Sequence, residues 1–107
     1  MRDLANLNKL EQYLIDHQIP YERIDAEDKP IDDGHTYCLV EMERHQICVP
    51  CEGAGRKWDA ICQRGSYGAE DGLLEIMGTI VSPWAGDSVE GFLTAQDVIE
   101  RIERGGA

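Results

Sequence analysis

Two stretches with the spacing of amphipathic helices stand at the ends of this chain, and the segments between them have the composition of strands. At the N-terminal end, leucines recur every three or four residues, at positions 4, 7, 10 and 14. Residues with this spacing share one face of a helix, so we predict a helix over roughly residues 3–17. Asp3 or Asn6 is suited to cap its start, and Ile19-Pro20 stops it.

The C-terminal stretch has the clearest local signal. Residues 94–97 (TAQD) form a Thr-x-x-Asp sequence, in which the threonine hydroxyl accepts a hydrogen bond from an otherwise unpaired amide of the first helical turn. An apolar stripe accompanies this cap and consists of Leu93, Val98, Ile99 and Ile102. The glycines at 105 and 106 are predicted to end the helix.

The middle of the chain predicts a sheet. We expect strands over residues 36–42, 45–49, 58–62, 73–81 and 89–93, and a short extended piece over 21–25. The run at 73–81 is the most apolar and is predicted to be central, whereas 89–93 is predicted to lie at an edge. A turn is expected at Glu43-Arg44 and a glycine-containing hairpin loop over 50–56.

The predicted fold is a single α+β domain over residues 1–107. It has an N-terminal helix, a four- to five-stranded, mostly antiparallel sheet and a C-terminal helix, with both helices on one face of the sheet. Residues 25–33 (DAEDKPIDD) lack periodicity and contain five acidic residues. We predict that they form a solvated loop.

The charge of the chain limits its partners. Its 107 residues carry a formal net charge of −11, whereas nucleic-acid binding needs a basic surface against the phosphates. We therefore expect no direct contact with nucleic acid and favour a basic protein as partner. No apolar run approaches the ~20 residues of a membrane span, and the first residues lack a secretory signal. We expect a cytoplasmic monomer or homodimer without a membrane partner.

Cys48 and Cys51 form a Cys-x-x-Cys pair, which raises the question of redox or metal chemistry. A redox pair needs its first thiol at a helix N-terminus, and the Glu-Gly-Ala-Gly that follows here is a poor helix start. A structural zinc ion needs four ligands, so Cys38, Cys62 or His45 would have to complete the set. Because Cys62 shares a strand face with apolar residues, we favour reduced structural thiols without a metal or cofactor.

Catalytic patterns are weak. No glycine-rich phosphate-binding motif opens a helix, and His17, His35 and His45 are not predicted to pair with a nucleophile; the last two are predicted at the surface. Lys57 next to Asp59 is the best candidate for a metal-dependent nuclease pair, and it is a weak one. We expect no enzyme activity.

Three segments carry a resemblance to a known group: residues 44–50 (RHQICVP), 57–78 (KWDAICQRGSYGAEDGLLEIMG) and 86–103 (GDSVEGFLTAQDVIERIE). Over roughly residues 44–104 the chain resembles small prophage and mobile-element proteins of gut Firmicutes. The resemblance brings no activity and no catalytic residue, and cysteines at positions 48 and 51 are not part of the group's pattern. It implies a phage setting, in which small acidic proteins resemble anti-CRISPR and anti-restriction inhibitors of host nucleases.

The prediction is a non-enzymatic, phage-associated protein that binds and inhibits a basic nucleic-acid-processing host protein, such as a CRISPR effector nuclease. Its predicted partner-binding residues are Asp25, Glu27, Asp28, Asp32, Asp33, Glu70 and Asp71. The alternative prediction is a small zinc-binding or metal-dependent domain that uses Cys48 and Cys51.

Overall fold

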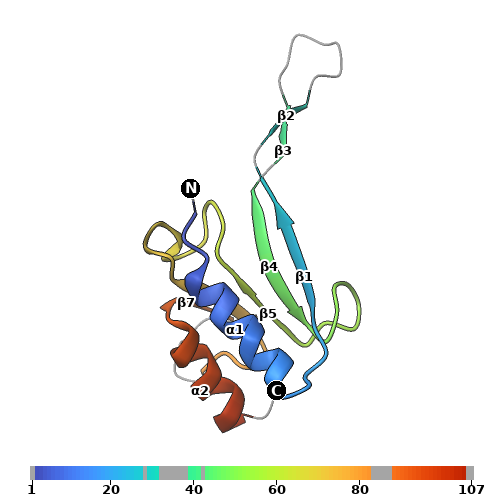
Figure 1. The fold of residues 1–107 in the computed structure, drawn as a ribbon, viewed down its shortest axis with the longest axis vertical. Coiled ribbons are helices and arrows are strands. Elements are labelled where there is room, and N and C mark those ends of the chain that lie inside the picture. Colours follow the sequence, from blue (N-terminus) through green and yellow to red (C-terminus); the bar gives the residue numbers. More distant parts are fainter. Residues whose placement is uncertain (1, 28, 32–38, 42, 83–87, 106–107) are drawn as a thin grey trace.

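The computed structural model describes residues 2–27, 29–31, 39–41, 43–82 and 88–105, with only the backbone of 29–31 and 39–41. In chain order the elements are α1 (Ala5–Asp16), β1 (Glu22–Ala26), β2 (Lys29–Ile31), β3 (Leu39–Glu41), β4 (Arg44–Val49), β5 (Trp58–Ile61), the 3₁₀ turn η1 (Ala69–Asp71), β6 (Leu74–Gly78), β7 (Val89–Leu93) and α2 (Ala95–Gly105). The predicted α+β class, with a helix at each end and an antiparallel sheet between them, is confirmed (Figure 1).

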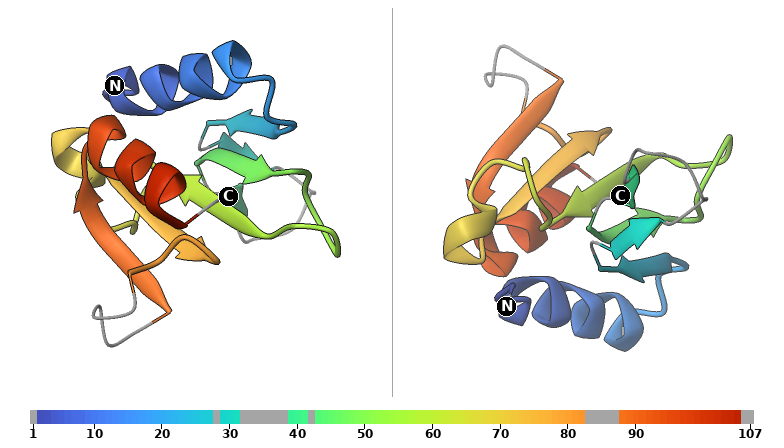
Figure 2. Two further views of the ribbon diagram at one scale, coloured as in Figure 1. Left: turned by 90° about the horizontal axis from the view of Figure 1, so that it is seen from below. Right: turned by 90° about the horizontal axis from the view of Figure 1, so that it is seen from above.

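Five strands form the main sheet in the order β1-β4-β5-β6-β7, and all neighbouring strands are antiparallel. The sheet is curved, and both helices lie on its hollow side (Figure 2). β7 is an edge strand, as predicted, but the prediction that 73–81 is central is wrong, because β5 holds that place. Three of the four β5 residues are buried, whereas β6 ends in exposed Met77 and Gly78; the run of apolar letters therefore overstates how deeply β6 is covered.

The helices bury the predicted stripes. Leu7, Leu10 and Leu14 of α1 have no exposed surface, and burial of each leucine contributes about 2 kcal/mol. In α2, Val98 and Ile102 are buried, and Ile99 and the predicted Leu4 are partly buried against the same core. The strands contribute Ile47, Val49, Trp58, Ala60, Cys62, Leu74 and Ile76. No helix in the described part of the chain is long and apolar enough to cross a bilayer.

Both predicted helix caps can be checked. Asp97 N donates to Thr94 Oγ1 at 3.1 Å and Thr94 N donates to Asp97 Oδ2 at 3.0 Å, so the predicted cap of α2 is confirmed. Asp3 Oδ1 accepts a hydrogen bond from Ala5 N at 2.9 Å in the first turn of α1. Asn6 does not cap its own helix: its Oδ1 accepts from Ala95 N at 2.9 Å, which ties α1 to the start of α2.

Strand pairing around the acidic segment differs from the prediction. Residues 25–33, predicted as a loop, contain the end of β1 and all of β2, which pairs with β3. The turn predicted at Glu43-Arg44 is wrong, because β4 begins at Arg44 and pairs with β1 instead of β3. The chain thus continues from β3 into β4, and β1–β2 with β3–β4 form one two-stranded ribbon that projects from the body (Figure 1). Three predicted residues, Asp28, Asp32 and Asp33, lie outside the described residues.

Candidate functional site

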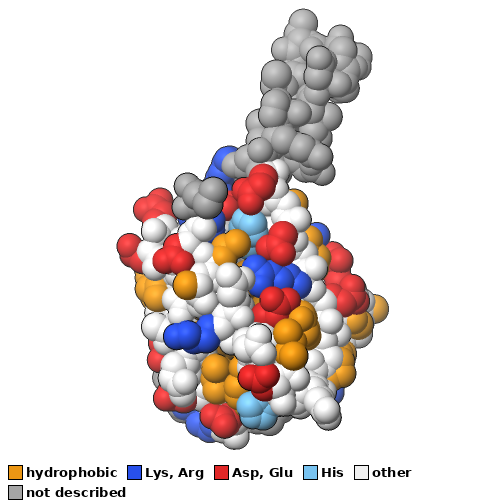
Figure 3. Space-filling view, in the orientation of Figure 1, with side chains coloured by type: hydrophobic (Ala, Val, Ile, Leu, Met, Phe, Trp, Pro, Cys, Tyr) orange, Lys and Arg blue, Asp and Glu red, His pale blue; other side chains and the backbone are white. Residues whose placement is uncertain are grey.

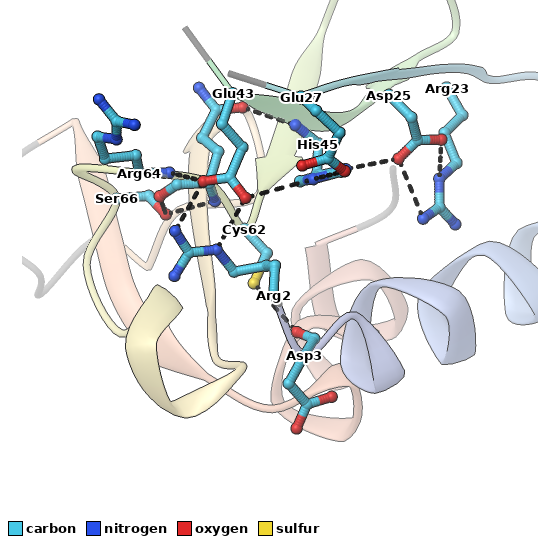
Figure 4. A network of polar contacts seen from close by, with 11 residues as sticks. Arg2, Asp3, Arg23, Asp25, Glu27, Glu43, His45, Cys62, Arg64 and Ser66 are labelled. Atoms are coloured by element: carbon cyan, nitrogen blue, oxygen red, sulfur yellow. Dashed lines mark hydrogen bonds and ion pairs between the residues drawn. The ribbon is translucent and has the colours of Figure 1, made fainter. Parts of the chain in front are cut away.

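The base of the ribbon brings four ionisable side chains to one face. Asp25 in β1 pairs with His45 in β4, and β2 pairs with β3 in the same register. Extended by two residues from the Asp25–His45 pair, this register places Glu27 opposite Glu43. Because side chains alternate between the faces of a strand, these four residues share one face of the ribbon. Figure 4 shows them converging on the side that faces α1.

His45 is buried, and the prediction that it lies at the surface is wrong. Only 2% of the residue is exposed, because it has the same strand phase as the core residues Ile47 and Val49. Its Nδ1 lies 2.8 Å from Asp25 Oδ1. A carboxylate can only accept, so Nδ1 carries the proton of this hydrogen bond.

The other ring nitrogen of His45 is placed differently. Its Nε2 lies 3.4 Å from Glu27 Oε1 and 3.4 Å from Glu43 Oε2. Neither contact is a hydrogen bond, and Nε2 has no hydrogen-bond partner among the described residues. A buried polar atom without a partner is costly, and such an atom indicates a ligand or a strained site.

Glu43 is buried and anchored by Arg2 at the start of the chain. Arg2 donates from Nη2 to Oε1 at 2.7 Å and from Nε to Oε2 at 3.0 Å, and Arg64 N donates to Oε1 at 2.7 Å. The hydrogen bonds from Arg2 are the main cause that lowers the pKa of Glu43, and burial opposes them. Glu43 is therefore an ionised carboxylate inside the protein, next to His45.

Asp25 is held within the fold, unlike the loop residue that the sequence predicts. Arg23 Nε donates to Asp25 Oδ2 at 3.0 Å, and His45 bonds to the other oxygen. Burial raises the pKa of Asp25, but the hydrogen bonds from His45 and Arg23 outweigh it, so that the pKa is lowered. Of the two described carboxylates in this acidic segment, Glu27 is the more open, with 79% of its side chain exposed.

The other predicted acidic pair, Glu70 and Asp71, is exposed in η1 beside two aromatic side chains. Tyr67 and Phe92 are 59% and 63% exposed, and their rings stack with centroids 6.1 Å apart. Together with Arg2 and Arg64 these four residues line a cavity of about 330 Å³. This surface combines apolar rings with carboxylates at its border.

The backbone holds the aromatic pair in place. Phe92 has a φ of +59°, a conformation that costs a non-glycine residue on the order of 1–3 kcal/mol. Its amide donates to Tyr67 O at 3.3 Å, and a Cβ at position 91 would collide with the Tyr67 side chain, so that glycine is required there. Tyr67 N in turn donates to Glu75 Oε1 at 2.9 Å. An exposed aromatic residue kept in a strained conformation indicates a functional surface.

The two acidic groups lie at the same end of the body. Arg2 bonds to Glu43 and also lines the cavity beside Glu70 and Asp71, so it stands between them. On the face drawn in Figure 3, however, acidic and basic side chains are interspersed over the body and do not form one continuous acidic area. The structure thus brings the predicted residues near one end without making a uniformly negative face.

The cysteines do not form a metal site in the described part of the chain. Cys48 and Cys62 are buried and Cys51 is half-buried, and burial raises the pKa of the Cys48 and Cys62 thiols, which is the reverse of what redox chemistry needs. Cys62 packs in the core, as predicted. Cys38 lies outside the described residues. Among the described residues the ligand-type atoms that gather closely belong to Glu27, Glu43 and His45.

The remaining catalytic candidates are placed apart. Lys57 is exposed, whereas Asp59 is buried and accepts a hydrogen bond from Gln46 Nε2 at 2.6 Å. His17 is exposed at the end of α1, with Nδ1 2.9 Å from Tyr13 O, and position 35 lies outside the described residues.

Comparisons with known proteins add no relative: no family model matches the chain, and neither a curated protein nor a solved structure is detectably similar to it. The functional reading therefore depends on the geometry. Sequence reasoning missed Arg2, Glu43 and His45. The phase of His45 with Ile47 and Val49 is a signal that could have found the histidine, whereas nothing local marks the partnership of Arg2 with a residue 41 positions away.

Proposed function

We propose that this protein is a non-enzymatic inhibitor that binds the basic surface of a nucleic-acid-processing protein. The observation that carries the proposal is the exposed, stacked pair of Tyr67 and Phe92 beside the carboxylates of Glu70 and Asp71. Binding hot spots are rich in aromatic residues and surrounded by a polar rim. A partner whose cations meet this rim would cover both rings.

The rigidity of the surface supports the proposal. Gly91 packs against the Tyr67 side chain, and the Phe92 amide bonds to the Tyr67 carbonyl, so both rings are ordered before a partner arrives. A surface that is ordered in advance loses less conformational entropy on binding. The strain at Phe92 is retained in a residue that contributes little to the core, which favours a role in binding over a role in folding.

The net charge of −11 supports a basic partner. Charges of opposite sign accelerate the encounter of two proteins and do so less at high salt. In this proposal Glu70 and Asp71 act at the aromatic surface, and Glu27 adds a carboxylate at the same end. Asp25 contributes less, because Arg23 and His45 already compensate its charge.

The phage setting, the cytoplasmic location and the CRISPR effector nuclease as partner follow from the sequence resemblance and belong to the proposal. They make guide-loaded effector nucleases and restriction nucleases the first partners to test. The proposal has the protein occupy the channel where such an enzyme holds nucleic acid, with carboxylates in place of phosphates. It does not itself contact nucleic acid.

The test is association kinetics with immobilised nucleases at several salt concentrations. We expect a double variant, Glu70→Gln with Asp71→Asn, to associate several-fold more slowly at low salt and to depend less on salt. The matched control, Glu100→Gln with Glu103→Gln, changes the net charge equally at exposed positions of α2 and should associate nearly as the parent does. Equal slowing in both variants would show that net charge alone acts, and the proposed surface would be wrong.

A further inference from the structure

Three ligand-type atoms meet at the base of the ribbon. A carboxylate oxygen of Glu27, a carboxylate oxygen of Glu43 and a ring nitrogen of His45 all lie within 4.8 Å of one another. His45 is 98% buried by its 2% exposure, and its Nε2, which lacks a hydrogen-bond partner among the described residues, points at both carboxylates. We propose that these three residues bind a zinc ion.

The distances favour a metal over hydrogen bonds. A charge-assisted N–H···O bond measures about 2.7–2.9 Å, and the Nδ1–Asp25 contact of His45 has that length at 2.8 Å. The two contacts of Nε2 are longer, at 3.4 Å each. Tetrahedral zinc with bonds of about 2.0–2.1 Å separates its ligand atoms by roughly 3.3 Å, the edge of the tetrahedron. The spacing at Nε2 is therefore that of two ligands on one ion.

The charges of the ribbon require a cation at this point. The register of β1 and β4 sets Glu27 opposite Glu43, and like charges directly opposite across two strands destabilise a sheet. With Nδ1 bonded as a donor to Asp25, a neutral His45 turns the lone pair of Nε2 towards these carboxylates. A divalent ion converts the repulsion among the three groups into three bonds.

The surroundings resemble the outer shell of a metal site. Ligating histidines usually donate their second ring N–H to a carboxylate, and ligating carboxylates are themselves hydrogen-bonded. Asp25 performs the first role for His45, and Arg2 and the Arg64 amide perform the second for Glu43. Both ligands are thus fixed in orientation by residues from β1, the N-terminal segment and the loop after β5.

The donor set points to zinc with one open position. Imidazole and carboxylate are ordinary zinc ligands, and three protein ligands leave the fourth place to water. Glu27, whose side chain is 79% exposed, marks the side that faces solvent, while His45 and Glu43 are buried. The ion would join the outer end of β1 to the start of β4. The site uses no cysteine, and it is independent of the aromatic surface.

The test uses the full chain, freed of metal with a chelator and titrated with Zn²⁺ in a calorimeter. We expect one ion per chain. Glu27→Gln removes an exposed ligand without a cavity and should weaken binding at least roughly tenfold. Glu22→Gln is the matched control, because Glu22 lies in the same strand on the opposite face, and it should bind as the parent does. Glu70→Gln with Asp71→Asn should also leave zinc binding unchanged.

A second probe removes the dependence on His45 variants that fail to fold. Co²⁺ in place of zinc reports four-coordinate geometry by its intense visible absorption, and a thiolate ligand adds a charge-transfer band. We expect the four-coordinate spectrum without the thiolate band, and loss of the spectrum in Glu27→Gln. Absence of saturable Zn²⁺ binding in the parent, equal binding by Glu27→Gln, or a thiolate band abolished by Cys51→Ser would overturn the proposal.

Discussion

Replacing Glu90 by glutamine should destabilise the fold at neutral pH and much less in acid. Glu90 in β7 accepts from Arg101 Nε at 2.9 Å and from Arg101 Nη2, and Ser82 N donates to it at 3.0 Å. The two side chains are 14% and 15% exposed. The hydrogen bonds from Arg101 lower the pKa of Glu90 from 4.5 to about 2, against the opposing effect of burial.

The size and sign of the effect follow from linkage. A pKa lowered from 4.5 to about 2 corresponds to about 3 kcal/mol of stability at pH 7, since one pKa unit is worth about 1.4 kcal/mol. Because the folded-state pKa is depressed, this contribution is complete above pH 4.5 and is lost as the pH falls towards 2. At pH 3 about 1 kcal/mol should remain. Solvent at the edge of the pair makes the first figure an upper bound.

The assay is urea unfolding of the parent and of Glu90→Gln at pH 7 and pH 3, followed by circular dichroism. Arg101→Met and the double variant complete a cycle that isolates the coupling between the two residues. We expect the difference between parent and Glu90→Gln to shrink by about 2 kcal/mol from pH 7 to pH 3. A difference that is equal at the two pH values, or larger in acid, would refute the reasoning.

Other changes have equally definite outcomes. Leu10→Ala should cost on the order of 2–5 kcal/mol in urea unfolding, because Leu10 has no exposed surface. Thr94→Ala removes the cap of α2 and should cost about 0.5–2 kcal/mol in the same assay. Phe92→Asn should keep the free energy of unfolding within about 1 kcal/mol of the parent, because asparagine tolerates the positive φ, and yet weaken partner binding. Cys51→Ser should shift the melting temperature by no more than a few degrees, since the thiol is half-buried in a loop.

Periodicity predicts the elements that bury apolar side chains. The stripes of α1 and α2 and the strands β4 to β7 follow from it because each has one face against the core. The pairing of β2 with β3 does not follow, since this part of the ribbon lies beyond the helices and its segment has no apolar alternation to read. The register of strands outside the core depends on backbone hydrogen bonds, which the sequence does not display.

The candidate sites were predictable to different degrees. The exposure of Glu70 and Asp71 agrees with a glycine-rich loop, but the neighbouring Phe92 reaches them only through the fold of β7 beside Tyr67. The placement of Asp25 and Glu27 against His45 needs the register of β1 and β4. Charge gave the acidic residues, and the three-dimensional pairing decides which of them are already neutralised.

DNA cleavage by a panel of guide-loaded CRISPR effector nucleases and restriction nucleases, with increasing amounts of this protein, tests the central claim most directly. We predict that at least one nuclease is inhibited, in competition with its nucleic acid and less strongly as salt is added. Phe92→Asn and the Glu70→Gln, Asp71→Asn double variant should both inhibit less than the parent. Full cleavage by every nuclease at saturating protein, or inhibition unchanged in both variants, would contradict the account.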